Sequence, residues 1–367
     1  MNNITEAYPV APVIGAEQIA LLEKLSNACA VSGDEGEVRA IVREQLKDVA
    51  DEYKIDALGN VLVTRKARQG DARALKVAVA AHMDEVGFML VDGEDALYSF
   101  ELVGGIDLRQ LPGKPVLVGK NHTPGVIGAR ALHLTTLEER MNTISLDTLR
   151  IDLGLGGKAK IGDRASFATR FKQVGPSLVG KALDNRLGVA TLIELVKHAP
   201  PNIELCAIFS TQEEVGARGA GVAVYYFDPD IAIAVDSTPA FDLPMWDNSE
   251  NTQYNTHLEH GPAIYIADSS TISDPRLVRH LAQTGDMLNL PYQFRQPGGG
   301  GTDAGGMQRR RAGIASLSIS VPHRYPHTPV QVARLSDWQA TTSLLYQALL
   351  RLPQDILTRP LDELSRP

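Results

Sequence analysis

The sequence predicts an α/β fold with a second, small β-rich (β-barrel-like) domain inserted into it. Short apolar runs such as 203–209 have the length and β-branched content of buried strands, and they alternate with amphipathic helical patterns. From Val86 to about Ala168, by contrast, short β-like pieces alternate with glycine, proline and charged turns. The predicted organisation is a flexible lead-in at 1–15, a discontinuous main domain at 16–86 and 170–356, the inserted domain at 87–169, and a tail at 357–367.

Composition indicates an ordinary globular protein of 367 residues, 44% apolar and 22% charged. Its net charge of −8, from 36 basic and 44 acidic side chains, argues against a nucleic-acid or anionic-membrane partner. Cys29 and Cys206 both lie in apolar segments, which is typical of small core residues in a reducing compartment. Because no signal peptide or membrane-length apolar run is visible, we expect a cytoplasmic protein.

In the first half of the main domain, the apolar pattern predicts helices over 17–50, a turn at Leu58–Asn60 and a strand at 61–63. The next buried strand, 76–81, ends in His82-Met83-Asp84-Glu85. On an extended backbone His82 and Asp84 point to the same side, as metal-competent or acid–base residues would. The alternative is a histidine whose role is only structural.

After the inserted domain, an amphipathic helix follows Asp184-Asn185, either of which could serve only as its N-cap. The strand at 203–209 leads to Glu213 and Glu214, for which a surface turn is the alternative. Further along, the sequence predicts a strand at 231–235 ending in Asp236, helices at 271–285 and 338–350, and a strand at 314–321 before His323 and His327.

Four predicted strands therefore end in histidine or carboxylate side chains, with Asp184 heading a helix beside them. In an open α/β sheet, ligands bind in the crevice outside the carboxyl ends of the strands. Two histidines and three or four carboxylates suit Zn²⁺, Co²⁺ or Mn²⁺, and the carboxylate count indicates two metals about 3.5–4 Å apart. The residues alone do not choose between His323 and His327.

The glycine-rich loop at 298–301 lacks the Lys-Ser/Thr pair and the helix start of a phosphate-binding P-loop. We interpret it as a tight loop at the site, where only backbone fits.

Five ordered segments resemble the glutamyl/deblocking aminopeptidases, the tetrahedral (TET) metallo-aminopeptidases of peptidase family forty-two, some relatives of which carry endoglucanase annotations. They are AHMDEVGFM (81–89), KALDNRLGVA (181–190), TQEEVGARGA (211–220), GGTDAGG (300–306) and VPHRYPHTPV (321–330). The resemblance extends from about Ser32 to the final helix and includes GVIGARALHL (125–134) in the inserted domain. It implies a three-layer α/β/α zinc-peptidase domain with a mixed sheet.

The resemblance also implies a site with two divalent metals, zinc first and cobalt or manganese as alternatives. One metal would take His82 and Glu214, or the equivalent pair, and the other Asp236 and His327, with Asp184 bridging. Glu213 would be the general base for metal-activated water, and Asp84 would hold His82. The family pattern selects His327 over His323, although His323 and Pro326 both depart from that pattern.

The implied function is removal of the N-terminal residue from peptides with a free N-terminus, by a homo-oligomer in which dimers assemble into a dodecamer. One alternative is a glycoside hydrolase using Glu213 and Glu214. It is disfavoured because retaining carboxyl groups face one another about 5–5.5 Å apart, whereas adjacent strand residues point to opposite faces. The other alternative is a non-catalytic peptide-binding scaffold.

Overall fold

The computed structural model describes residues 10–69, 73–245, 247, 256–295 and 297–358. Residues 1–9 of the predicted lead-in and 359–367 of the predicted tail lie outside this part of the chain. Within the rest of the lead-in, Ile14 is buried, and its backbone N–H donates to Gln339 Oε1 at 2.5 Å. No helix in the described ranges is long and apolar enough to cross a membrane.

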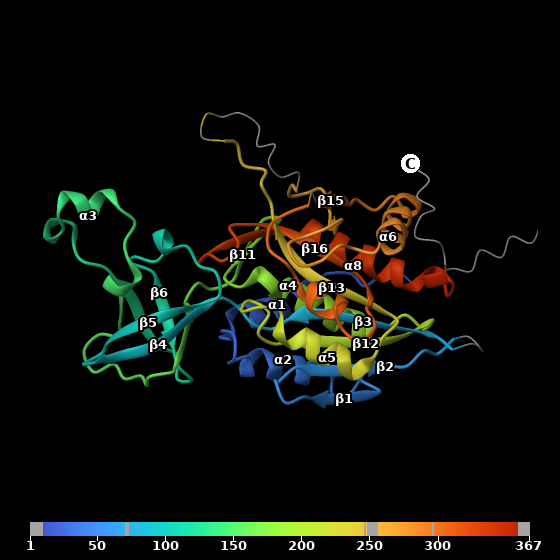
Figure 1. Ribbon diagram of the computed structural model, residues 1–367, viewed down its shortest axis with the longest axis horizontal. Coiled ribbons are helices and arrows are strands. Elements are labelled where there is room, and N and C mark those ends of the chain that lie inside the picture. Colours follow the sequence, from blue (N-terminus) through green and yellow to red (C-terminus); the bar gives the residue numbers. More distant parts are fainter. Residues whose placement is uncertain (1–9, 70–72, 246, 248–255, 296, 359–367) are drawn as a thin grey trace, which may run out of the picture.

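An 11-stranded mixed sheet forms the centre of the molecule (Figure 1). Its main path, in spatial order, is β1 (Glu52–Ile55), β2 (Val61–Arg65), β12 (Ile203–Ser210), β3 (Leu75–His82), β13 (Ile231–Pro239), β16 (Ala315–Arg324), β17 (Gln331–Arg334), β11 (Ser177–Gly180) and β10 (Lys172–Val174). Off this path, β14 (Ala263–Tyr265) pairs with β15 (Gln293–Arg295) and β16. The four central strands β12, β3, β13 and β16 are mutually parallel, so their carboxyl ends lie at one edge of the sheet.

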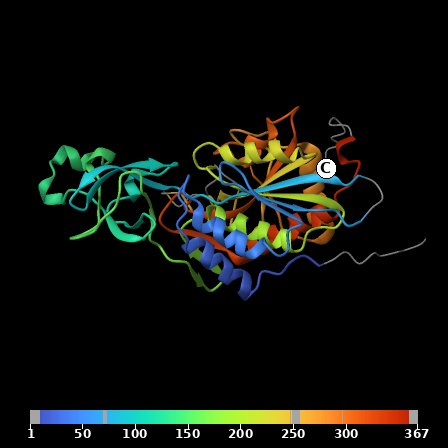
Figure 2. The ribbon, with the colours of Figure 1, turned by 90° about the horizontal axis from the view of Figure 1, so that it is seen from below.

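Helices cover both faces of this sheet, as Figure 2 shows from below. On β3, Val77, Val79 and Ala81 point into one core, whereas Ala78 and Ala80 point into another. The first core is shared with α1 (Ala16–Asn27), α2 (Gly36–Leu46), α4 (Leu183–Lys197), α6 (Pro275–Leu288) and α8 (Leu335–Leu350), and the second with α5 (Arg218–Phe227) and α7 (Asp303–Gln308). Because β3 is covered on both sides, its buried part from Val77 to Ala81 is an unbroken apolar run. The predicted three-layer α/β/α fold is confirmed.

Gly188 lets α4 pack closely on the sheet. A Cβ at this position would lie 2.6 Å from the Val235 carbonyl oxygen and 2.2 Å from Asn185 Oδ1. Asn185 Oδ1 instead accepts the Gly188 N–H at 3.0 Å. Of the two N-cap candidates, Asn185 therefore takes the capping role, and the Asp184 side chain is available for other contacts.

The inserted segment forms a closed six-stranded barrel with its own core, which confirms the predicted β-rich, barrel-like domain. The strand order is β4 (Gly87–Glu94), β5 (Leu97–Val103), β8 (Arg150–Asp152), β7 (Thr123–Gly128), β6 (Pro115–Val118) and β9 (Arg164–Phe167). Figure 1 shows this barrel beside one end of the sheet domain, with α3 (Leu137–Met141) at its far side. Short 3₁₀ turns occur at η1 (Leu108–Gln110), η2 (Leu132–Leu134), η3 (Leu146–Thr148) and η4 (Ile356–Thr358).

One predicted helix begins later than its apolar pattern indicates. The helix expected over 271–285 begins at Pro275 and ends at Leu288. Asp274 is its N-cap, and the Asp274 side chain accepts the Arg276 N–H. Pro275 occupies the first turn, where a backbone N–H would have no acceptor within the helix. This local capping chemistry, rather than the hydrophobic period, sets the boundary.

Candidate metal centre

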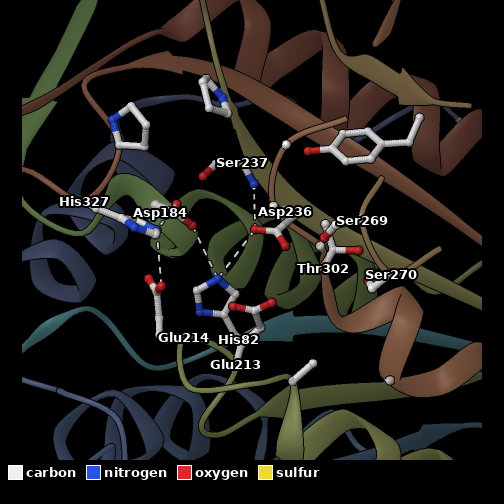
Figure 3. A pocket seen from close by; sticks show the side chains of 18 of the residues that line it. His82, Asp184, Glu213, Glu214, Asp236, Ser237, Ser269, Ser270, Thr302 and His327 are labelled. Carbon is white, nitrogen blue, oxygen red and sulfur yellow. Dashed lines mark hydrogen bonds and ion pairs between the residues drawn. The ribbon is translucent and has the colours of Figure 1, made fainter. Parts of the chain in front are cut away.

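All of the predicted site residues except Asp84 line one cavity of about 520 Å³ at the carboxyl edge of the parallel strands (Figure 3). Different elements supply them: His82 ends β3, Asp236 lies in β13, and His327 follows β16. Glu213 and Glu214 lie in the turn after β12, and Asp184 lies in the first turn of α4. Asp84 is fully buried just behind His82. The predicted strand ends therefore do converge.

The side chains form two groups of possible metal ligands that share Asp184. In the first group, His82 Nε2 lies 3.3 Å from Asp184 Oδ1 and 3.5 Å from Asp236 Oδ1. In the second, His327 Nε2 lies 3.7 Å from Asp184 Oδ2 and 3.2 Å from Glu214 Oε2. The two oxygens of Asp184 thus face opposite groups, as a bridging carboxylate would.

This grouping corrects the pairing inferred from the resemblance. His82 lies with Asp236 rather than with Glu214, and His327 lies with Glu214 rather than with Asp236. The reason is the strand order, since β3 and β13 are neighbours and place His82 beside Asp236. The turn after β12 and the loop after β16 bring Glu214 and His327 together on the other side of Asp184.

Asp84 connects His82 to the turn that holds the two glutamates. Its Oδ1 accepts the Glu213 N–H at 3.0 Å and lies 3.5 Å from His82 Nδ1. Its Oδ2 accepts the Glu214 N–H at 3.1 Å and the Ser32 hydroxyl at 2.6 Å. His82 Nδ1 also lies 3.2 Å from the Asp84 backbone carbonyl oxygen. Asp84 therefore holds the histidine ring through both its carbonyl and its carboxylate, and it holds the backbone of the acidic turn through the carboxylate.

Glu213 and Glu214 line the same cavity, which corrects the expectation that adjacent residues would point to opposite faces. That expectation applies to extended strands. The strand β12, however, ends at Ser210, and Gln212 has a φ of 57°, so the chain has left the extended conformation before the glutamates.

Burial and mutual repulsion shift the pKa values of these acids. Burial raises the pKa of Glu214 and of Asp236. Burial, together with the charges of Asp236 and Asp303, holds the pKa of Glu213 well above its usual range. Bound cations would reverse this effect, because they favour ionised carboxylates.

The pKa values of His327 and His323 are shifted in opposite directions. Burial opposes a charge on His327, but the adjacent Glu214 carboxylate outweighs it and raises the pKa of His327 to about 9. Burial lowers the pKa of His323 to about 4, and neither of its buried ring nitrogens has a hydrogen-bond partner among the described residues. His327 lines the cavity, whereas His323 is not among its lining residues.

The donor set fits two divalent cations. Five side chains offer nitrogen and oxygen ligand atoms in two overlapping groups. Buried carboxylates are normally paired or bound to metal, yet in the described part of the chain the ion-pair partners of Asp184, Glu214 and Asp236 are only His82 and His327. Two cations would neutralise the excess of negative charge.

Sequence reasoning assigned no role to Arg295 and Tyr265, which line the cavity, or to Asp303, which follows the lining residue Thr302. Asp303, at the start of α7, is buried and hydrogen-bonded to the Ser210 hydroxyl, and burial raises its pKa to about 7. Arg295 is buried in the cavity wall, with its guanidinium over the Tyr265 ring at 4.4 Å. A signal existed only for Asp303, which follows the glycine-rich loop in GGTDAGG. Gly299–Gly301 of that loop do line the cavity, and Gln296 lies outside the described residues.

Comparisons with known proteins place this geometry among peptidases. The family model described as M42 glutamyl aminopeptidase matches residues 59–344. The chain is 36% identical to a putative aminopeptidase from Acetivibrio thermocellus, over 90% of this chain and 97% of that one.

Solved structures agree with this placement. An aminopeptidase from the archaeon Desulfurococcus kamchatkensis superimposes with a TM-score of 0.84 at 31% identity, covering 91% of this chain and 94% of its own. The TET1 peptidase of Pyrococcus horikoshii, which can assemble into a tetrahedron or a large octahedral shell, has a TM-score of 0.79 at 31% identity, covering 91% and 100%.

Proposed function

The chain belongs to the M42 glutamyl aminopeptidase family, and on this basis we propose that it is a two-metal aminopeptidase acting on peptides with a free N-terminus. The single observation that supports the two-metal reading best is the position of Asp184 between two ligand groups. His82 and Asp236 would hold one divalent cation, Glu214 and His327 the other, and Asp184 both. Zinc suits this nitrogen and oxygen set first, with cobalt or manganese as alternatives.

Bound cations supply positive charge that lowers the pKa of water and stabilises negative charge developing on the scissile carbonyl oxygen. Glu213 is the proposed general base. It lines the cavity beside His82 (Figure 3), and none of the described residues forms an ion pair with its carboxylate. The carboxylate takes a proton from the attacking water and returns it to the leaving amine as the C–N bond breaks.

Asp84 is the proposed positioning residue. Its hydrogen bonds hold the Glu213–Glu214 backbone, and its Oδ1 faces His82 Nδ1, which leaves Nε2 directed at Asp184 and Asp236. A carboxylate behind a histidine ligand fixes the ring orientation and raises its basicity.

We also propose that the chain acts as a homo-oligomer, with dimers assembling into a dodecamer. The support is the assembly of the TET1 relative together with exposed apolar side chains on the barrel, among them Leu137 and Met141 at 78% and 86% exposure. Mass in solution tests this: a monomer at micromolar concentration would exclude it.

The decisive variant for the chemistry is Glu213→Gln. The amide keeps the shape of the side chain but cannot accept the proton, so kcat should fall by about 10²–10⁴-fold while the metal content per chain stays at the wild-type value. His327→Ala is the matched comparison and should lose metal and activity together. A Glu213→Gln enzyme that keeps both metals and a tenth or more of wild-type kcat excludes Glu213 as the base.

A further inference from the structure

A second cluster of metal-ligating side chains lies away from the cavity, at the seam between the sheet domain and the barrel. Cys29 follows α1, Glu37 lies in the first turn of α2, and His122 immediately precedes β7 of the barrel. One ligand atom from each of the three side chains lies within 4.8 Å of the others. Two domains thus contribute to one group of sulfur, oxygen and nitrogen donors.

The local geometry already holds these groups together. His122 Nε2 lies 2.5 Å from Glu37 Oε1, and Glu37 Oε2 accepts the Cys29 backbone N–H at 2.9 Å. Cys29 Sγ lies 3.1 Å from the Ser166 hydroxyl. A small cavity of about 10 Å³ borders Cys29 and Glu37, which is roughly the space for one water molecule.

The backbone at His122 is an independent observation. Its φ is 50°, in the left-handed region, and its N–H donates to the Gly119 carbonyl at 3.1 Å in the turn between β6 and β7. A residue with a Cβ pays about 1–2 kcal/mol for this conformation. Strained backbone of this kind clusters at functional sites, and the His122 imidazole at this position contacts Glu37.

Neighbouring cations do not use the donors of the cluster. Lys120 forms its ion pair with Asp34. Arg164, which also borders the small cavity, donates to the carbonyl oxygens of Ser32 and Gly162. Among the described residues the ion-pair partner of Glu37 is therefore His122 itself, so a cation bound between the three side chains would replace this direct contact.

We propose that Cys29, Glu37 and His122 form a third metal site, for Zn²⁺ or a cation of similar ligand preference. Thiolate sulfur, imidazole nitrogen and carboxylate oxygen are all zinc ligands, and three of them leave a fourth tetrahedral position for water. Binding would convert the Cys29 thiol to a thiolate and release its proton to solvent. The ion would join the barrel to the N-terminal helices, at a place separate from the catalytic cavity.

Cobalt gives a test that reports this site alone. A thiolate bound to Co²⁺ produces an intense near-ultraviolet charge-transfer band, whereas the catalytic ligand groups contain only nitrogen and oxygen donors. We expect full-length protein titrated with Co²⁺ to develop this band and to bind one equivalent more than the catalytic groups take. Cys29→Ser and His122→Ala should abolish the band, and Glu37→Gln should weaken the binding by about tenfold or more.

Two control variants sharpen the result. Cys206→Ser removes the other thiol, which is buried in the core, and His133→Ala removes an exposed barrel histidine; both should retain the band. No band at saturating Co²⁺, or a band that survives Cys29→Ser, overturns the proposal. Aminopeptidase activity of Cys29→Ser is measured in parallel, so that failure of the proposed catalytic function and failure of this site are seen separately.

Discussion

Asp84→Asn is the sharpest test of how the site is held together. The carboxylate accepts three hydrogen bonds, from Ser32 Oγ and from the backbone N–H groups of Glu213 and Glu214, at 2.6, 3.0 and 3.1 Å. An amide of the same shape has one acceptor oxygen, so its NH₂ must face at least one of these donors. Hydrogen bonds to charged groups contribute about 1.5–3 kcal/mol, and a buried donor left without a partner costs about 1–3 kcal/mol.

Relief of the burial penalty on the Asp84 charge offsets part of this loss, so we expect the free energy of unfolding to fall by about 3 kcal/mol. The displaced acidic turn and the loss of the carboxylate beside His82 should lower kcat/KM by about 10–100-fold, although the Asp84 carbonyl contact to His82 Nδ1 is retained. Urea unfolding and steady-state kinetics at saturating metal measure the two effects. The matched control is Asp107→Asn, whose exposed pair with Arg109 is screened by solvent, so this variant should leave the free energy of unfolding and kcat/KM nearly unchanged. If Asp84→Asn behaved like this control in both assays, the bridging role of Asp84 would be wrong.

Three further predictions follow from the same contacts. Burial lowers the pKa of His323 to about 4, below its unfolded value of 6.5. The free energy of unfolding should therefore be highest above pH 6.5 and should fall by about 3 kcal/mol as the pH drops from 6.5 through 4. His323→Gln should show a flatter dependence of the free energy of unfolding on pH over this range. The buried Glu85 carboxylate lies 2.7 Å from Lys181 Nζ and 3.1 Å from the Arg186 guanidinium. Glu85→Gln should therefore lower the free energy of unfolding by about 3–5 kcal/mol. The control is Glu52→Gln, which breaks an exposed pair with Lys66 and should leave the free energy of unfolding nearly unchanged. Chelation should abolish peptidase activity, and Zn²⁺, Co²⁺ or Mn²⁺ should restore it. Peptidase activity that survives complete metal removal would contradict the two-metal proposal, and a metal-independent glycosidase activity would favour the two-carboxylate alternative.

Parts of the fold and site were predictable because local chemistry determines them. The apolar runs ending at His82 and after Ile203 predict strands buried on both faces, and their pairing is parallel over eight residue pairs. Parallel strands end at one edge, so the meeting of His82, Asp236 and the acidic turn followed from topology. The boundary of α6 did not follow, since Asp274 and Pro275 determine it by capping.

Contacts between distant segments were not predictable in this way. Asp84 binds the Glu213 and Glu214 N–H groups across 129 and 130 positions of sequence. Cys29 and Cys206 look alike in the sequence, yet Cys206 is buried in the core while Cys29 lies at the seam beside Glu37 and His122. Periodicity indicates which residues are buried, but it does not indicate which neighbours they meet.

The sequence by itself determined the α/β class, the inserted β-rich segment and the kinds of side chain brought to the strand ends, because apolar period and residue chemistry are local properties; the three-layer arrangement was implied by the family resemblance. Only the tertiary structure decided that His82 lies with Asp236 and Glu214 with His327 around Asp184. That grouping depends on β13 lying beside β3 and on two loops folding toward each other, and both arise from packing between segments far apart in the chain.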